Sequence, residues 1–259
     1  MAFASRLYTA FIYRREDKFL FKLNPLLKIV SLIPLSLIVT VLYSPISLTL
    51  YLAVILLLAY FLANLHRCVE SVLTLKYFFI VIFTVIYVYT SYPQLVLNVY
   101  GLVYAYTTTL RFIILIILFS LFISTTNITD LAYALTKLGL PYEIAFTLAL
   151  TVRFIPTIAR DIQAVYDAQR SRGLELERGG FFRRLKNLSA ILIPAFTTTL
   201  MRVDKVAEAL ESRAFGTVKK RTYLSSVNVG HQDILFLLFS IILVLAIYYL
   251  DVNMRLPTL

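Results

Sequence analysis

The sequence predicts an all-α integral membrane protein with about five transmembrane helices and long amphipathic cytoplasmic helices. Sixty per cent of its 259 residues are hydrophobic, whereas a soluble domain averages about 45–50%. In addition, five apolar runs approach the ~20 residues that a helix needs to cross the hydrocarbon core of a bilayer. These runs cover residues 26–43, 46–62, 77–92, 101–124 and 234–250.

The limits of the runs follow from local sequence. Ser44-Pro45 separates the first run from the second, and the third ends at Ser91-Tyr92-Pro93. Lys28 lies near the start of the first run, where its long side chain is expected to snorkel to the interface. Transmembrane strands are excluded, because they need only about 9–11 residues that alternate between polar and apolar.

The positions of Lys and Arg predict the orientation. Five precede the first run, two lie between the second and third, and fifteen lie between the fourth and fifth. The connections at Ser44-Pro45 and 93–100 contain none. Because positively charged loops stay in the cytoplasm, we expect a cytoplasmic N-terminus and an external C-terminus. Topology therefore accounts for the net charge of +11, and no nucleic-acid partner is expected.

This pattern divides the chain into three parts. Residues 1–124 are expected to form a membrane bundle with four spans, and residues 234–259 a C-terminal membrane helix. Residues 125–233 are expected to form a cytoplasmic or interfacial region. Its two apolar stretches are shorter than a membrane span. Apolar stretches of about 10–14 residues are more typical of buried or interfacial segments. The two stretches are 144–155 and 188–201.

Two amphipathic helices are predicted in this middle region, at 157–172 and 200–213. Pro156 and Pro194 are expected to separate them from the apolar stretches that precede them. In the first helix, apolar residues recur at the i, i+4, i+7 spacing of one helical face. The opposite face of each helix is charged, so each can lie at a membrane surface or receive a protein partner.

Both helices end in the same pattern, Ala-x-x-Ser-Arg followed by a small residue. The first ends at Ser171-Arg172-Gly173 and the second, 41 residues later, at Ser212-Arg213-Ala214. Glycine suits the left-handed residue just beyond a helix, and a terminal arginine complements the helix dipole. Ordinary capping explains either end alone, but its repetition favours a shared function.

At these residues the sequence resembles the transmembrane T component of energy-coupling factor transporters, the family that includes the cobalt-transport permease subunit. The resemblance is clearest over residues 151–216 and extends weakly over nearly the whole chain. Its strongest segments are LTVRFIP at 150–156, AQRSRG at 168–173, Gly179-Gly180 and ESRAFG at 211–216. Weaker similarity is found in LNPLLK at 23–28, Arg111, TTN at 125–127 and LGLP at 138–141.

The resemblance implies a multi-pass subunit of the cell membrane that joins two ABC-type ATPases to a substrate-binding S component. In this family, Ala-Arg-Gly signatures at the ends of two coupling helices dock into the ATPases. They correspond here to Ser171-Arg172-Gly173 and Ser212-Arg213-Ala214. Ser replaces the leading Ala in both, and Ala replaces Gly in the second, which predicts a different shape for that end. The S component would select a vitamin or a transition-metal ion.

Other sites are few. Arg111 is the one charge deep in a predicted span, where a charge usually faces protein or water. We expect it to tie its helix to a neighbouring helix or to the S component. The chain lacks a phosphate-binding loop, so the partner ATPases would bind ATP and Mg, and no cofactor, metal site or enzymatic activity is expected here. A stand-alone permease and a membrane-anchored enzyme are the alternatives.

Overall fold

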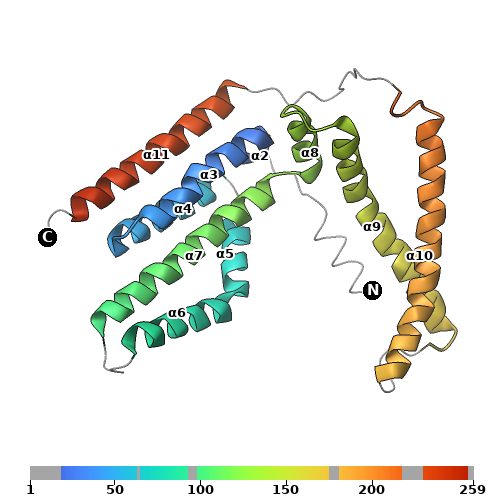
Figure 1. Cartoon of the computed structure of the whole chain (residues 1–259), viewed down its shortest axis with the longest axis horizontal. Coiled ribbons are helices and arrows are strands. Elements are labelled where there is room, and N and C mark those ends of the chain that lie inside the picture. Colours follow the sequence, from blue (N-terminus) through green and yellow to red (C-terminus); the bar gives the residue numbers. More distant parts are fainter. Residues whose placement is uncertain (1–18, 63–64, 93–97, 175–180, 218–229, 256–259) are drawn as a thin grey trace. The chain divides into compact units, whose positions relative to one another are not determined.

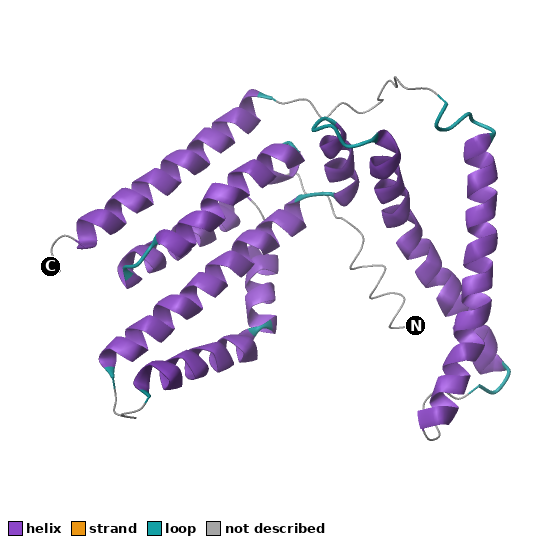
Figure 2. Cartoon of the chain, in the orientation of Figure 1, coloured by secondary structure: helices purple, strands orange, loops and turns teal. Residues whose placement is uncertain are grey.

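The structure is a computed structural model that describes residues 19–62, 65–92, 98–174, 181–217 and 230–255. Within these ranges all regular secondary structure is helical, which confirms the predicted fold class (Figure 2). The helices form two compact units. We call the described residues of 15–134 and 227–259 the bundle, and the described residues of 135–226 the helix pair. Each unit is described by itself.

Every predicted apolar run is a helix of the bundle (Figure 1). A short helix, α5, lies between the second and third runs, and α8 crosses the boundary of the bundle. The bundle helices are α2 (Phe19–Lys22), α3 (Pro25–Val41), α4 (Pro45–Leu62), α5 (Leu65–Thr74), α6 (Lys76–Ser91), α7 (Val99–Thr125), α8 (Ile128–Thr136) and α11 (His231–Arg255).

The bundle helices differ in whether they are long and apolar enough to cross a membrane. In the bundle, α7 and α11 are each long and apolar enough to cross a membrane, whereas α3 and α4 are shorter apolar helices. Residues 68–74 of α5 and the whole of α6 are bent by 59° at Leu75 and pass the same test only as a pair. Of the five predicted spans, two are thus met by single helices of spanning length and a third by the bent pair, whereas α3 and α4 are shorter than that test requires.

The limits of α3 and α7 have a local cause. Asn24 precedes α3, and its Oδ1 accepts a hydrogen bond from the Leu26 N–H at 3.0 Å, while Pro25 occupies the first helical position. Asn98 caps α7 in the same way through the Tyr100 N–H, at 3.0 Å. Asparagine is among the preferred N-cap residues because its oxygen satisfies a donor that the helix cannot.

The core of the bundle surrounds α7, which packs against α3, α4, α5 and α6. Ile114 of α7 and Tyr51 of α4 are fully buried there. Helix α11 packs chiefly against α3. At one end the Asn24 N–H donates to Asp233 Oδ1 at 2.7 Å, and at the other the Ser44 N–H donates to Asp251 Oδ1 at 3.0 Å. The first contact joins the starts of α3 and α11, and the second joins their ends, so the two helices run parallel.

The helix pair consists of α9 (Tyr142–Ser171) and α10 (Phe181–Glu211). Both are about twice as long as predicted, because Pro156 and Pro194 lie inside them and do not end them. An interior proline removes one backbone hydrogen bond and favours a kink, but α10 contacts α9 on both sides of Pro194, at Ala190 and at Arg202. By length and composition α9 also qualifies as a membrane span, which the sequence did not predict. The Gly179-Gly180 pair lies outside the described residues.

Candidate functional site

The end of α9 is closed by its own backbone. Arg172 is the C-cap residue, and Gly173 follows in the left-handed region with φ of 87°. The Gly173 N–H donates to the Arg170 carbonyl at 3.0 Å, and the Leu174 N–H to the Gln169 carbonyl at 3.1 Å. This pair of bonds is the Schellman motif, which satisfies carbonyls that a helix end leaves without partners.

The end of α10 has the same shape. The Ala214 N–H donates to the Glu211 carbonyl at 2.9 Å, and the Phe215 N–H to the Leu210 carbonyl at 3.0 Å. Ala214 occupies the left-handed position with φ of 54°, as the only residue other than glycine with positive φ in the described ranges. The prediction that alanine would give this end a different shape was therefore wrong.

An aromatic cluster explains why alanine accepts that conformation. A left-handed non-glycine residue costs about 1–2 kcal/mol. Phe215 follows Ala214 and lies over two rings at the start of α9, with centroid distances of 6.0 Å to Tyr142 and 4.8 Å to Phe146. Aromatic pairs contribute about 0.5–1.5 kcal/mol each beyond the area that they bury, which is enough to offset the cost.

The arginines at the two ends are exposed. Arg172 and Arg213 each follow the last turn of their helix with the side chain open to solvent. Among the described residues, neither guanidinium has a hydrogen-bond acceptor or an ion-pair partner. Because backbone N–H groups already satisfy the carbonyls nearby, capping does not use the hydrogen-bonding capacity of either side chain. The N–H donors of both guanidinium groups are therefore available to another molecule.

An ion pair joins α9 to α10, the two helices that cross in Figure 1. Arg202 Nη2 lies 2.6 Å from Asp161 Oδ2, and the two residues are 41 positions apart. The same offset relates Arg172 to Arg213, so Asp161 and Arg202 are equivalent positions of the two helices. In an antiparallel pair, equivalent positions meet only at the local two-fold axis. The ion pair therefore lies on an approximate two-fold axis of the helix pair.

The two arginine ends are placed symmetrically about this axis. Arg172 follows Asp161 by eleven residues, and Arg213 follows Arg202 by eleven. At 1.5 Å per residue each end lies about 16 Å from the crossing, in opposite directions. Gln169 Nε2 donates to the Ala190 carbonyl at 3.2 Å on one side of the crossing, and the ring cluster of Phe215 lies on the other. The repeated motif is thus displayed twice, in related positions.

Arg111 makes its contact inside the bundle. Its Nη2 donates to the Leu42 carbonyl at 2.7 Å, just past the end of α3, and its guanidinium carbon lies 6.0 Å from the centre of the Tyr43 ring. Its Nε is buried without a partner among the described residues. The structure thus places Arg111 where it ties α7 to the neighbouring helix α3.

A second charged residue at the same turn was missed by the sequence analysis. Asp251 of α11 is fully buried, and it accepts hydrogen bonds from the Ser47 hydroxyl and from the Tyr43 and Ser44 N–H groups. An acceptor is favourable at the N-terminus of a helix such as α4. The available signal was the position of Asp251 directly after the fifth apolar run. Among the described residues, no three His, Cys, Asp or Glu side chains could jointly hold a metal ion.

Comparison with known proteins identifies the family. Residues 16–224 match the family model described as cobalt transport protein (CbiQ). The chain belongs to the cobalt transport protein family. The match includes α9, α10 and both arginine ends. It confirms the resemblance found in the sequence and makes the chain a multi-pass membrane protein of a transport family.

Individual relatives agree with this family. A Clostridium kluyveri protein named energy-coupling factor transporter transmembrane protein EcfT is 34% identical over 143 residues, which are 52% of this chain and 53% of that one. A Bifidobacterium longum protein named putative ABC transporter ATP-binding protein BL0043 is 35% identical over 145 residues, 53% of this chain and 19% of that one. The chain spans about half the length of these curated relatives, or less.

Proposed function

We propose that the chain is the transmembrane coupling subunit of an ATP-driven importer of the energy-coupling factor type. The ends of α9 and α10 each engage one of two ABC-type ATPases, and the chain joins them to a membrane-embedded S component that binds the substrate. The observation that carries the proposal is the pair of exposed arginines, Arg172 and Arg213. They lie on two helix ends of the same shape, at matching distances from one crossing.

The geometry supports two related partners. A pair of similar ATPases offers two related grooves, and the approximate two-fold axis through Asp161 and Arg202 offers two related helix ends. Arginine presents five donors in a rigid planar fork that matches carboxylates with fixed geometry. A rigid α-helix that ends in such a contact transmits the movement of the ATPase to the rest of the chain.

The relatives and the bundle support the remaining roles. One relative is named as an energy-coupling factor transmembrane protein and another as an ABC transporter ATP-binding protein. The described core of the bundle is largely aliphatic around Ile114 and Leu118, which favours substrate binding by a separate S component over a stand-alone permease. We further propose that residues 125–233 are cytoplasmic or interfacial, that the substrate is a vitamin or a transition-metal ion, and that the partner ATPases bind ATP and Mg.

Co-purification from native membranes tests the proposal. The tagged chain, solubilised in a mild detergent, is expected to bring down two ATPase chains and one small hydrophobic protein. The double variant Arg172→Ala with Arg213→Ala is expected to lose the ATPases but keep the hydrophobic protein. Stoichiometric binding of a vitamin or metal ion by the isolated chain, with no ATPase in the complex, would instead favour the stand-alone permease.

A further inference from the structure

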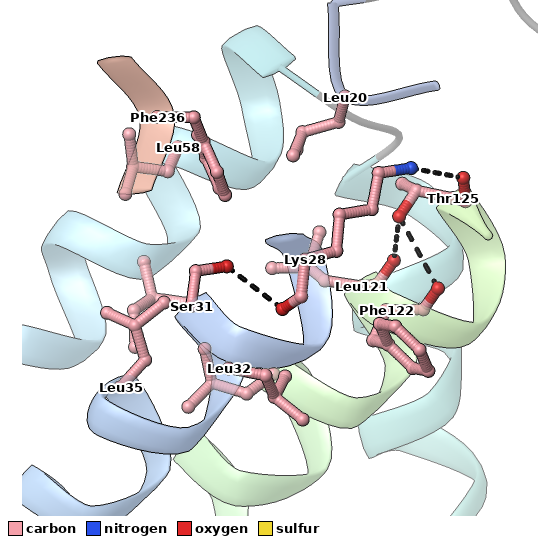
Figure 3. A pocket seen from close by; sticks show the side chains of 12 residues that line it. Leu20, Lys28, Ser31, Leu32, Leu35, Leu58, Leu121, Phe122, Thr125 and Phe236 are labelled. Atoms are coloured by element: carbon pink, nitrogen blue, oxygen red, sulfur yellow. Dashed lines mark hydrogen bonds between the residues drawn. The ribbon is translucent and has the colours of Figure 1, made fainter. Parts of the chain in front are cut away.

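The bundle contains an apolar pocket near the starts of α3 and α11 and the end of α7 (Figure 3). Nine of its twelve lining residues are Leu, Ile or Phe. The polar members are Lys28, Ser31 and Thr125. The Ser31 hydroxyl donates to the Lys28 carbonyl at 2.9 Å, so it is already bonded within its own helix. The walls of the pocket therefore suit a hydrocarbon chain.

Lys28 is the only charged side chain among the described residues that line the pocket. It is 5% exposed, so its side chain lies inside the bundle. Its Nζ donates to the Thr125 carbonyl at 2.8 Å. An ammonium has three N–H donors, and the described residues supply this one acceptor. Two donors of a buried cation remain for a ligand.

Nearby carboxylates attract the ammonium without bonding to it. Asp233 and Asp130 both act on Lys28 electrostatically, but neither forms an ion pair with it among the described residues. The oxygens of Asp233 are engaged by backbone donors, since Oδ1 accepts from the Asn24 N–H at 2.7 Å and Oδ2 from the Gly230 N–H at 2.8 Å. Both Asp233 oxygens thus already accept backbone hydrogen bonds, and a ligand in the pocket can supply further acceptors to Lys28.

The combination selects an amphiphile with an anionic head. Basic pockets between membrane helices on the cytoplasmic side bind anionic lipid headgroups, and the positively charged residues before α3 predict that this end of the bundle is cytoplasmic. A free anion would leave the leucine walls without a partner. A phosphatidylethanolamine head carries its own ammonium, which competes with Lys28 for the phosphate.

We propose that this pocket binds one anionic phospholipid, with a phosphate oxygen accepting hydrogen bonds from Lys28 and an acyl chain against the leucine walls. Such a lipid would contact α3, α7 and α11 together at one end of the bundle. This site is independent of the coupling function, because it uses none of the residues of the helix pair.

Native mass spectrometry of the full chain tests the site. The protein is stripped of lipid in dodecyl maltoside and titrated with palmitoyl-oleoyl phosphatidylglycerol or the matching phosphatidylethanolamine. We expect one phosphatidylglycerol to bind at least tenfold more tightly than phosphatidylethanolamine. Lys28→Met, which keeps the length of the stem, is expected to abolish that preference. Lys76→Met, which removes an exposed lysine outside the pocket, is the matched control and is expected to preserve it.

A second variant tests the apolar part of the site. Leu32→Phe narrows the pocket and keeps Lys28, so it is expected to weaken binding of the long-chain lipid more than that of dihexanoyl phosphatidylglycerol. Elution volume and helical circular dichroism confirm the fold of each variant. Equal binding of both headgroups, or an unchanged preference in Lys28→Met, overturns the proposal. Competition by inorganic phosphate as effective as that by the lipid overturns it in favour of a free anion.

Discussion

Replacement of Arg172 and Arg213 separates docking from helix capping. The carbonyls at both helix ends are satisfied by backbone N–H groups, and neither guanidinium has a partner among the described residues. Substitution of such exposed side chains changes stability by no more than about 0.5 kcal/mol. In contrast, truncation of one member of a buried, hydrogen-bonded charge contact at an interface costs about 2–5 kcal/mol.

The two magnitudes predict different results. At 1.4 kcal/mol per tenfold change, each of Arg172→Ala and Arg213→Ala should weaken ATPase binding from about 30-fold to several-thousand-fold. Thermal unfolding of the isolated chain should change little. Arg172→Lys should also bind poorly, because lysine lacks the planar fork of arginine.

The chain supplies a matched control for each end. Arg170 is an exposed cation in the last turn of α9, and Lys205 is an exposed cation of α10. Arg170 complements the helix dipole, which is worth about 0.3–1 kcal/mol, and Lys205 lies before the last turn of α10. Arg170→Ala and Lys205→Ala should therefore leave ATPase binding almost intact. Affinity is measured by titration of immobilised chain with the ATPase pair. Full affinity in the Arg172 and Arg213 double variant, or equal losses in the controls, would refute docking through these side chains.

Three further predictions follow from the packing of the helices. Ala214→Gly removes the left-handed strain just beyond α10 and should leave the free energy of unfolding, measured by denaturant titration, unchanged or up to about 1 kcal/mol higher. Ala207→Gly, inside α10, should lower it by about 1 kcal/mol in the same titration. Asp251→Ala leaves two N–H donors without their acceptor and should destabilise the detergent-solubilised chain by at least about 2 kcal/mol; an unchanged melting temperature would contradict this. Gly101→Ala places a Cβ 2.8 Å from Thr90 Oγ1, so it should cost about 1–3 kcal/mol, and Thr90→Ala should rescue it in a double-mutant cycle.

The sequence predicted those features of the fold that depend on nearby residues. Hydropathy located α3, α4, α6, α7 and α11 to within a few residues, because each apolar run forms one helix. The same local view placed breaks at Pro156 and Pro194, where the structure has none. Continuity there depends on contacts between α9 and α10, which hydropathy and propensity do not contain.

In the candidate site, too, the features set by nearby residues were predictable and those set by distant residues were not. The repeated Ser-Arg ends were visible because both lie in short segments of sequence. The partners of Arg111 were not, since Leu42 lies 69 positions away. Asp251 contacts Ser47 across 204 positions, and only the folded chain brings them together. The shape of the Ala214 end was mispredicted because Phe215 packs on rings at the start of the other helix.

The ion pair at the crossing of α9 and α10 has a consequence for what the chain can recognise. A residue on a two-fold axis faces its own counterpart, so two identical helices would bring like charges together at that point. Asp161 and Arg202 avoid this by being opposite in sign, which commits the two helices to different identities. Under the docking proposal, the two surfaces that the ATPases contact also differ. The end of α9 presents Gly173, and the end of α10 presents Ala214 beside the packed ring of Phe215. Each ATPase would therefore bind its own helix end, and an exchange of the two ATPases between the ends would give mismatched contacts.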